Sequence, residues 1–178
     1  DSPAGPPSFG EVSPAWADLA MKAVRTGAEL AREGRVAALV TAPINKEGIH
    51  RAGYTCQGHT DFLADLFGVD NHAMMLVGGP IRVVLVTVHV PLARVSELLD
   101  TDDIIGKIEL TRRALERFGF REPKIAVAGL NPHAGEAGAF GDEEGTIIRP
   151  AVEACRDRGV DVTGPLPPDT LFYQLYHG

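Results

Sequence analysis

The sequence contains little cysteine and no long apolar segment. Its two cysteines, Cys56 and Cys155, lie far apart and match no metal-binding or redox spacing. A chain with so little cysteine is not built around a disulfide framework, and we expect a reduced, cytoplasmic setting. No run reaches the roughly 18 consecutive apolar residues of a transmembrane helix, so we expect no membrane partner.

The N-terminus and the charge balance exclude further classes. The opening stretch DSPAGPPSFGEVSP lacks the basic-then-apolar pattern of a signal peptide, and it lacks an initiator Met, so we expect a trimmed start. Lys and Arg number 17 against 24 Asp and Glu, which gives a net charge of −7. This acidic balance disfavours nucleic acid and anionic membranes as partners.

The usual nucleotide-binding glycine motifs are also missing. The loop 135–141 reads G-E-A-G-A-F-G, which is neither the G-x-G-x-x-G dinucleotide fingerprint nor a P-loop. Its glycines would let backbone amides approach an anion. Taken alone, however, the loop is more simply interpreted as a plain surface loop.

What the sequence does contain is an alternation of helix and strand patterns in a composition that is 44% apolar. Residues 1–12, rich in Pro, Gly and Ser, are predicted to be a loop or linker, and residues 13–178 one α/β unit. Continuous apolar strands predict a mainly parallel or mixed sheet flanked by helices. Helices are expected from Ser13–Pro14 to Gly34, from near Thr60, from Thr101 to Phe118, over Thr146–Arg158 and in PPDTLFYQLYHG; strands are expected at Val36–Val40, Ala73–Val77, Ile81–Val88, Lys124–Leu130 and Val160–Val162, and a loop at TAPINKEG.

Three histidines fall where ligands gather in α/β proteins. His89 ends the expected strand IRVVLVTVH, His133 follows the strand KIAVAGL, and His59 stands at an expected helix start. Ligands of open α/β sheets bind at the carboxyl ends of strands, and imidazole is a common ligand of divalent metals. The spacing matches no compact zinc motif, so a structural histidine at each position remains an alternative. The other candidates, His50 and His72, are interpreted as surface residues, and Lys46 as either an anion partner or a solvated lysine.

Five motifs together resemble a known family. They are T-A-P-I-N-K-E at 41–47, G-H-T at 58–60, T-V-H-V-P-L at 87–92, G-L-N-P-H-A-G-E at 129–136 and G-P-L-P-P-D-T-L-F at 164–172. In this order they resemble the 4-hydroxythreonine-4-phosphate dehydrogenase family of vitamin B6 biosynthesis. The resemblance covers residues 13–178, and G-L-N-P-H-A-G-E is its most specific part.

The resemblance implies a fold like that of isocitrate and isopropylmalate dehydrogenases and a homodimer with sites at its interface. It implies a divalent metal, Zn, Co or Mg, held by three histidines, two of which correspond to His89 and His133. The third belongs to a Tyr-His-Asp-Gln-Gly motif that this sequence does not contain, and we interpret the Tyr-His pair at His177 as a coincidence. The chain is therefore expected to be the middle part of a longer subunit.

The resemblance also implies the substrate contacts and the reaction. His59 and Thr60 match substrate-binding positions, Asp169 matches an acidic residue near the site, and Lys46 is a further candidate for a catalytic charge partner. The implied reaction is oxidation of 4-phosphooxy-L-threonine by NAD or NADP, followed by decarboxylation, with the metal lowering the pKa of the substrate hydroxyl.

Several alternatives stay open. A sister enzyme of the same family would act on 4-phospho-D-threonate, 4-phosphoerythronate or a cis-dihydrodiol. An inactive metal- or phosphate-binding fragment belongs to another class. A metal-dependent phosphatase would need carboxylate ligands beside the histidines, for which the sequence offers Glu136, Asp142, Glu143 and Glu144.

Overall fold

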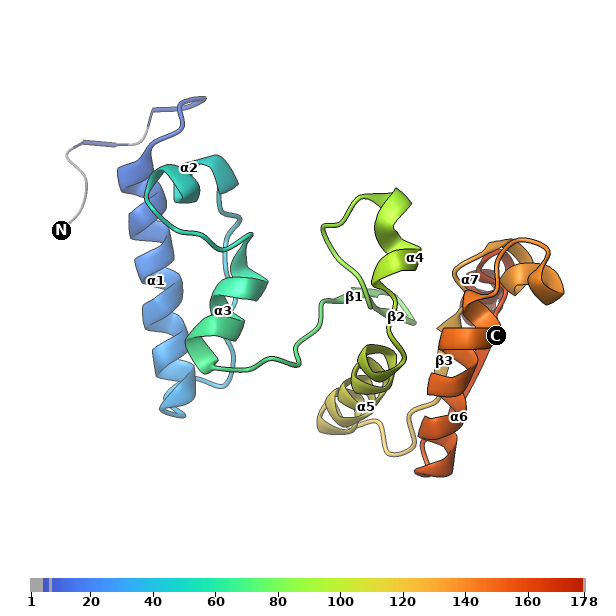
Figure 1. The fold of residues 1–178 in the computed structure, drawn as a ribbon. Helices are drawn as coiled ribbons and strands as arrows, with labels where there is room; N and C mark the ends of the chain where they lie inside the picture. Colours follow the sequence, from blue (N-terminus) through green and yellow to red (C-terminus); the bar gives the residue numbers. More distant parts are fainter. Residues whose placement is uncertain (1–4, 7, 178) are drawn as a thin grey trace. The chain divides into compact units, whose positions relative to one another are not determined.

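The computed structural model describes residues 5, 6 and 8–177 and divides into two compact units, Asp1–Asp70 and Asn71–Gly178 (Figure 1). Each unit has an apolar cluster of its own. The expectation of a single α/β unit over residues 13–178 stays a prediction. Of the predicted N-terminal loop, residues 1–4 and 7 lie outside the described residues, and the described remainder up to residue 12 contains neither helix nor strand.

The first unit consists of three helices, α1 (Pro14–Arg32), α2 (Lys46–Arg51) and α3 (His59–Phe67). The start predicted for α1 is confirmed, because the Ser13 side chain accepts a hydrogen bond from the Trp16 N–H and a proline occupies the first turn. The buried side chains that hold the three helices together are Met21, Val24, Ile49 and Phe62.

Two expectations for the segment between α1 and α2 are wrong. Val36–Val40 forms no strand, and Val40 is 93% exposed. A strand requires a neighbour that accepts its backbone hydrogen bonds, and the described residues of the first unit contain no strand. The TAPINKEG loop ends in a helix rather than running through, because the Asn45 side chain caps α2 by accepting from the Gly48 N–H at 2.7 Å.

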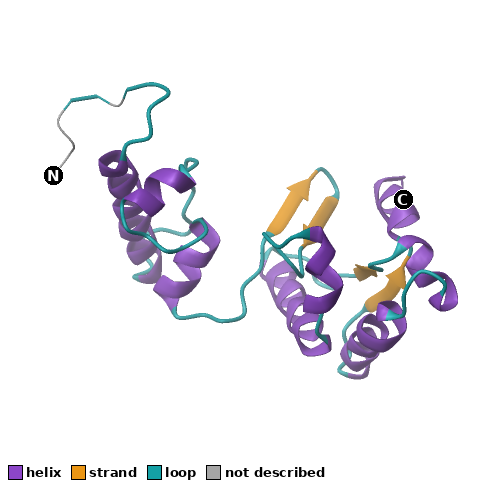
Figure 2. Cartoon of the chain, turned by 45° about the horizontal axis from the view of Figure 1, so that its top comes forward, coloured by secondary structure: helices purple, strands orange, loops and turns teal. Residues whose placement is uncertain are grey.

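The second unit begins with an antiparallel hairpin of β1 (Met75–Gly78) and β2 (Ile81–Val84), joined at Gly79–Pro80 (Figure 2). Strands were predicted at Ala73–Val77 and Ile81–Val88, and in the hairpin Leu76 and Val77 are 53% and 63% exposed. The predicted strand Ile81–Val88 also stops early, at Val84, where its pairing with Met75 ends the hairpin.

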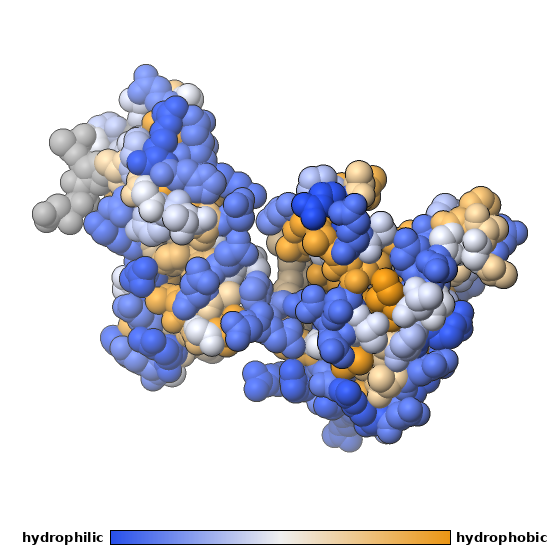
Figure 3. All heavy atoms as spheres, viewed as in Figure 1, coloured by the Kyte–Doolittle hydropathy of each residue, from blue (hydrophilic) through white to orange (hydrophobic). Residues whose placement is uncertain are grey.

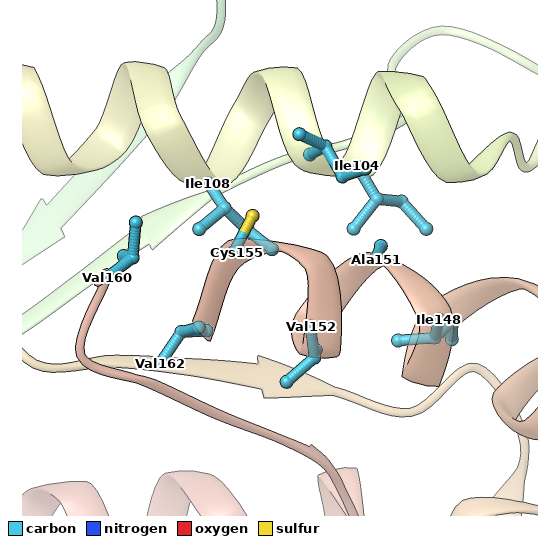
Figure 4. Close-up of a cluster of buried hydrophobic side chains, with 9 residues drawn as sticks. Ile104, Ile108, Ile148, Ala151, Val152, Cys155, Val160 and Val162 are labelled. Carbon is cyan, nitrogen blue, oxygen red and sulfur yellow. The ribbon is translucent and has the colours of Figure 1, made fainter. Parts of the chain in front are cut away.

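The main core of the second unit lies between helices and a parallel strand pair. Strands β3 (Ile125–Ala128) and β4 (Val162–Leu166) pair in parallel, and α5 (Thr101–Arg117) packs on α6 (Arg149–Asp157). Figure 4 shows the buried side chains of this cluster, with those of α5 facing those of α6. The helix predicted at Thr146–Arg158 is present, and it is preceded by one π-helical turn at Glu144–Ile148.

The short helices η1 (Leu92–Arg94), α4 (Val95–Leu98) and α7 (Pro168–His177) complete the second unit. The segment η2 (Pro132–Gly138) is a turn rather than a regular helix, because its backbone dihedrals from His133 to Ala137 are non-helical. With one antiparallel and one parallel strand pair among helices, the unit confirms the predicted α/β class with a mixed arrangement of strands. An apolar groove of about 360 Å³ lies between the hairpin, α5, β3 and α7. Apolar side chains also gather on the face of this unit seen in Figure 3.

Candidate active site

The loop that carries His133 leaves the carboxyl end of β3. Strands β3 and β4 run parallel with Ile125 opposite Val162, and beyond β3 the Gly129 N–H donates to the Leu166 carbonyl at 2.8 Å. Because the carboxyl ends of parallel strands meet at one edge, the segments that follow the two strands begin side by side. The loop around His133 and the start of α7 therefore share an edge of this sheet.

At that edge the structure brings together two of the residues chosen from the sequence. His133 Nδ1 lies 3.6 Å from Asp169 Oδ2, and the two side chains are 62% and 48% exposed. The ring of Phe140 stands 6.4 Å from the His133 ring, centroid to centroid. A carboxylate beside one ring nitrogen favours the tautomer that directs the other nitrogen's lone pair to a ligand. At 3.6 Å the two atoms are at ion-pair distance rather than hydrogen-bonded, and the carboxylate lies on the Nδ1 side of the ring.

The backbone around His133 is left-handed. Every residue from His133 to Gly138 has a positive φ, including His133 at 54°, Ala134 at 53° and Glu136 at 43°. A left-handed conformation costs roughly 1–2 kcal/mol for each residue other than glycine. Such a turn persists only where its surroundings hold it, and residues in such conformations cluster at functional sites.

The buried carboxylate of Glu144 lies beneath this loop. The side chain is 2% exposed, and its two oxygens accept from the Asn131 backbone N–H at 2.6 Å and from Asn131 Nδ2 at 3.0 Å. Burial by itself raises the pKa of Glu144, but the hydrogen bonds that the carboxylate accepts, first those from the backbone and side chain of Asn131, together outweigh burial and hold the pKa below its ordinary value. Glu144 is therefore an ionised anchor of the loop.

The second metal candidate, His89, lies in an exposed segment after β2 and also has a positive φ, 58°. A histidine in the left-handed region is uncommon, and both candidate ligands share this feature. The shared conformation is the local property that distinguishes His89 and His133 from ordinary surface histidines.

The remaining candidates belong to the first unit. Lys46 is exposed and begins α2, directly after its cap Asn45. His59 and Thr60 occupy the first turn of α3, as the expected helix start required, and both are half-buried. Nε2 of His59 is buried and has no hydrogen-bond partner among the described residues. A buried polar atom of this kind is satisfied when a ligand or a further chain segment supplies a partner.

The described residues do not by themselves form a complete metal centre. No group of three or more His, Cys, Asp or Glu side chains within the described part of the chain is close enough to hold an ion. The imidazole donors suit a divalent metal chemically, and they account for part of a site. His177 lies near the end of α7, and its ring centroid is 4.4 Å from that of Tyr173. In the sequence it is far from the motif that contains His133.

Sequence reasoning missed two features of the site. Asn131 was not singled out, and Glu144 was considered only as one of several acidic residues that would serve a phosphatase. Its carboxylate is instead engaged by Asn131. His72, interpreted as a surface residue, is half-buried, and its Nδ1 is buried without a partner among the described residues. The available signal for Glu144 was the glycine spacing of the loop, since glycines allow a buried group to approach closely.

An α/β fold with candidate ligands on the loops that follow its strands is characteristic of enzymes that bind small substrates at the carboxyl edge of a sheet. Within the described residues, no helix has the length and apolarity that crossing a bilayer requires. The chain belongs to the family described as pyridoxal phosphate biosynthetic protein PdxA, which it matches over residues 2–178.

Individual relatives and a solved structure agree with this assignment. The chain is 47% identical to a 4-hydroxythreonine-4-phosphate dehydrogenase of Desulforapulum autotrophicum, an alignment that covers 92% of this chain and 48% of the relative. It is 45% identical to a D-threonate 4-phosphate dehydrogenase of Pectobacterium atrosepticum, with 90% and 49% covered. The crystal structure of a 4-hydroxythreonine-4-phosphate dehydrogenase from Klebsiella pneumoniae superposes with a TM-score of 0.88 at 47% identity, covering 95% of this chain and 51% of that one. The chain thus spans about half the length of the relatives it matches.

Proposed function

We propose that the protein containing this chain is a metal-dependent, NAD- or NADP-linked dehydrogenase that oxidises and decarboxylates 4-phosphooxy-L-threonine in pyridoxal phosphate biosynthesis. The observation that carries the proposal is the His133–Asp169 pair, held on a left-handed loop within the G-L-N-P-H-A-G-E motif. The names of the relatives, which are dehydrogenases of phosphorylated hydroxy acids, support the same reaction class.

In this proposal His89 and His133 are donors to a divalent metal, Zn, Co or Mg, and a third donor comes from outside these 178 residues. When bound, the ion supplies a positive charge that favours ionisation of a substrate hydroxyl. Asp169 faces Nδ1 of His133 at 3.6 Å and so orients the ring. An oriented ring keeps its Nε2 lone pair available without a further rotamer cost on binding.

The first unit supplies the substrate contacts. Nε2 of His59 is buried and lacks a partner among the described residues, so a hydrogen bond to substrate would satisfy it. The neighbouring Thr60 hydroxyl lies in the same first turn of α3. Lys46, exposed at the start of α2, is the candidate partner for the substrate phosphate or carboxylate. A homodimer and a cytoplasmic location are part of this proposal.

A second candidate substrate is 4-phospho-D-threonate. It is favoured by the Pectobacterium atrosepticum relative, whose name states that activity and whose identity of 45% is close to that of the first relative. Both substrates carry a phosphate, a carboxylate and an oxidisable hydroxyl, so the same metal and charge contacts serve either reaction. The two substrates differ at the carbon next to the carboxylate, which carries an amino group in one and a hydroxyl in the other. The residues proposed here do not distinguish between them.

The test is a substrate comparison with the complete protein that contains this chain. The purified protein is supplied with Zn²⁺, Co²⁺ or Mg²⁺ and with NAD or NADP, and nicotinamide reduction is followed with each of the two phosphorylated acids. We expect reduction with 4-phosphooxy-L-threonine. Phosphate release without nicotinamide reduction would instead identify a phosphatase, and no turnover of either acid under any combination would reject the proposal.

Substitution of the proposed donors sharpens this test. His89→Ala and His133→Ala should each lower kcat/KM more than about 100-fold, because loss of a donor exceeds the 10–100-fold effect of losing a group that merely supports one. His177→Ala is the matched control, since His177 is an exposed histidine of the same unit outside the proposed site. Near-normal turnover by either donor variant would remove that histidine from the site.

A further inference from the structure

Glu144 is the one buried charged residue among those the structure describes, and no role in the proposed reaction requires it directly. It lies in a π-helical turn at the start of the helical segment that continues as α6. Burying a carboxylate is costly unless hydrogen bonds replace its hydration. Apolar packing alone therefore does not explain why a carboxylate occupies this buried position.

The hydrogen bonds of Glu144 converge on the residue just ahead of the left-handed turn. Oε1 accepts from the Asn131 N–H at 2.6 Å, and Oε2 accepts from Asn131 Nδ2 at 3.0 Å. Asn131 Nδ2 also donates to Glu143 Oε2 at 2.8 Å, so the amide is fixed from two sides. Asn131 is two residues before His133, so these hydrogen bonds act on the chain where it enters the turn.

Two glycines on either side of His133 make room for the carboxylate. A Cβ added to Gly129 would lie 3.0 Å from Oε1, and one added to Gly135 would lie 2.7 Å from Oε2. Any side chain at Gly135 would displace Glu144, and at Gly129 the carboxylate would have to shift. The loop thus wraps around the carboxylate, with Asn131 as donor and the two glycines as close neighbours.

We propose that Glu144 is a positioning residue whose buried carboxylate holds Asn131 and thereby keeps His133–Gly138 in the left-handed turn and His133 beside Asp169. The effect of Glu144 on the turn involves only residues of the second unit. Its effect on metal binding rests on the proposed function, in which His133 is a metal ligand.

The first experiment measures the turn in the metal-free protein. Glu144→Gln keeps the size and shape of the side chain but replaces one oxygen with an amide that would face the donor Nδ2 of Asn131. We expect the NMR couplings that report the sign of φ at His133–Ala137 to change, and the Asn131 amide proton to exchange faster. Glu153→Gln, which makes the same change at an exposed position on α6, should leave both unchanged.

The outcome against the proposal is equally definite. Unaltered couplings at His133–Ala137 in a folded Glu144→Gln protein would show that the turn does not depend on the carboxylate. If that variant fails to fold, Asn131→Ala removes the side-chain donor while leaving the carboxylate and the backbone N–H, and it should shift the same couplings. Native couplings in Asn131→Ala would overturn the proposal in that case.

A second experiment separates this inference from the proposed function. Co²⁺ is titrated into the complete protein and its visible absorption is followed for the wild type, His133→Ala, Glu144→Gln and Glu153→Gln. We expect His133→Ala to lose the imidazole-dependent absorption and Glu144→Gln to bind about tenfold more weakly, the scale of effect for groups that orient a ligand. If His133→Ala binds like the wild type, the metal role of His133 fails; if His133→Ala loses binding while Glu144→Gln matches Glu153→Gln, the positioning role fails.

Discussion

At the residue scale, the candidate site depends on positions where a side chain would not fit. Gly135 has a φ of 80°, and the space a Cβ would fill is closed by Glu144 Oε2 at 2.7 Å and the Gly141 carbonyl at 2.9 Å. Gly145, ten residues further along the chain, has nothing within 4 Å of the corresponding position. A side chain is therefore excluded at Gly135 but not at Gly145, a difference that the sequence alone does not reveal.

Gly135→Ala should destabilise the second unit by roughly 1–3 kcal/mol, because the left-handed backbone and the crowded carboxylate both oppose a methyl group. Gly145→Ala is the matched control and should be neutral or gain up to about 1 kcal/mol, since alanine favours a helical turn. Urea denaturation followed by circular dichroism measures both. Equal free energies of unfolding for the two variants would contradict the closed packing described around Gly135.

Glu144 also predicts a pH dependence of stability. Its pKa is depressed in the folded state, since the hydrogen bonds it accepts, those from Asn131 foremost, together outweigh the effect of burial. A carboxyl whose pKa falls on folding stabilises the protein at neutral pH, and this contribution is lost as the pH falls below about 4, where ordinary glutamates take up protons. Glu144→Gln should therefore flatten the acid limb of a plot of unfolding free energy against pH. An acid limb of unchanged slope would show that Glu144 titrates alike in the folded and unfolded protein.

At the element scale, the short helix α2 positions one of the candidate residues, Lys46. α2 is a helix of 6 residues, and its first residue is Lys46. A helix this short does not form by propensity alone, so its cap and its packing determine whether it exists. Its cap is Asn45, which accepts from the Gly48 N–H at 2.7 Å, and Ile49 is fully buried in the first unit's core.

Asn45→Ala should cost about 1 kcal/mol in the free energy of unfolding of the first unit, because it leaves a helix N–H without its acceptor. It should also raise KM for the phosphorylated substrate in the complete protein, since the start of α2 directs Lys46. Lys46→Ala is the paired variant, expected to raise KM without the loss of stability. A stability loss with unaltered KM in Asn45→Ala would separate the cap from substrate binding.

The elements that sequence patterning predicted correctly are those with strong local signals. The capped helices α1 and α5 begin where Ser13 and Asp100 accept from backbone N–H groups, and their apolar faces recur at helical spacing. The strands were predicted less well, and Val36–Val40 failed altogether. An apolar run specifies a strand only together with a partner, and partners are distant in sequence.

At the scale of the whole molecule, the chain has two apolar clusters rather than one. Met21 is fully buried among α1, α2 and α3, and Ile108 is buried between α5 and α6. Met21→Ala and Ile108→Ala should each cost roughly 2–5 kcal/mol through lost contacts and the cavity that remains. Amide hydrogen exchange should speed up in α1–α3 for the first variant and in α5 and α6 for the second. Equal acceleration throughout the chain in either variant would indicate one cooperative core.

The sequence by itself determined the local features of this protein: the helix starts, the α/β alternation and the five motifs that led to its family. These follow from hydrogen bonding and side-chain periodicity within a few residues of the chain, which a sequence displays directly. Only the tertiary structure decided that His133 lies beside Asp169, that the loop turns left-handed and that Glu144 anchors it. Those contacts join residues from separate elements, and the free energy that holds a strained turn comes from partners whose proximity exists only after the chain has folded.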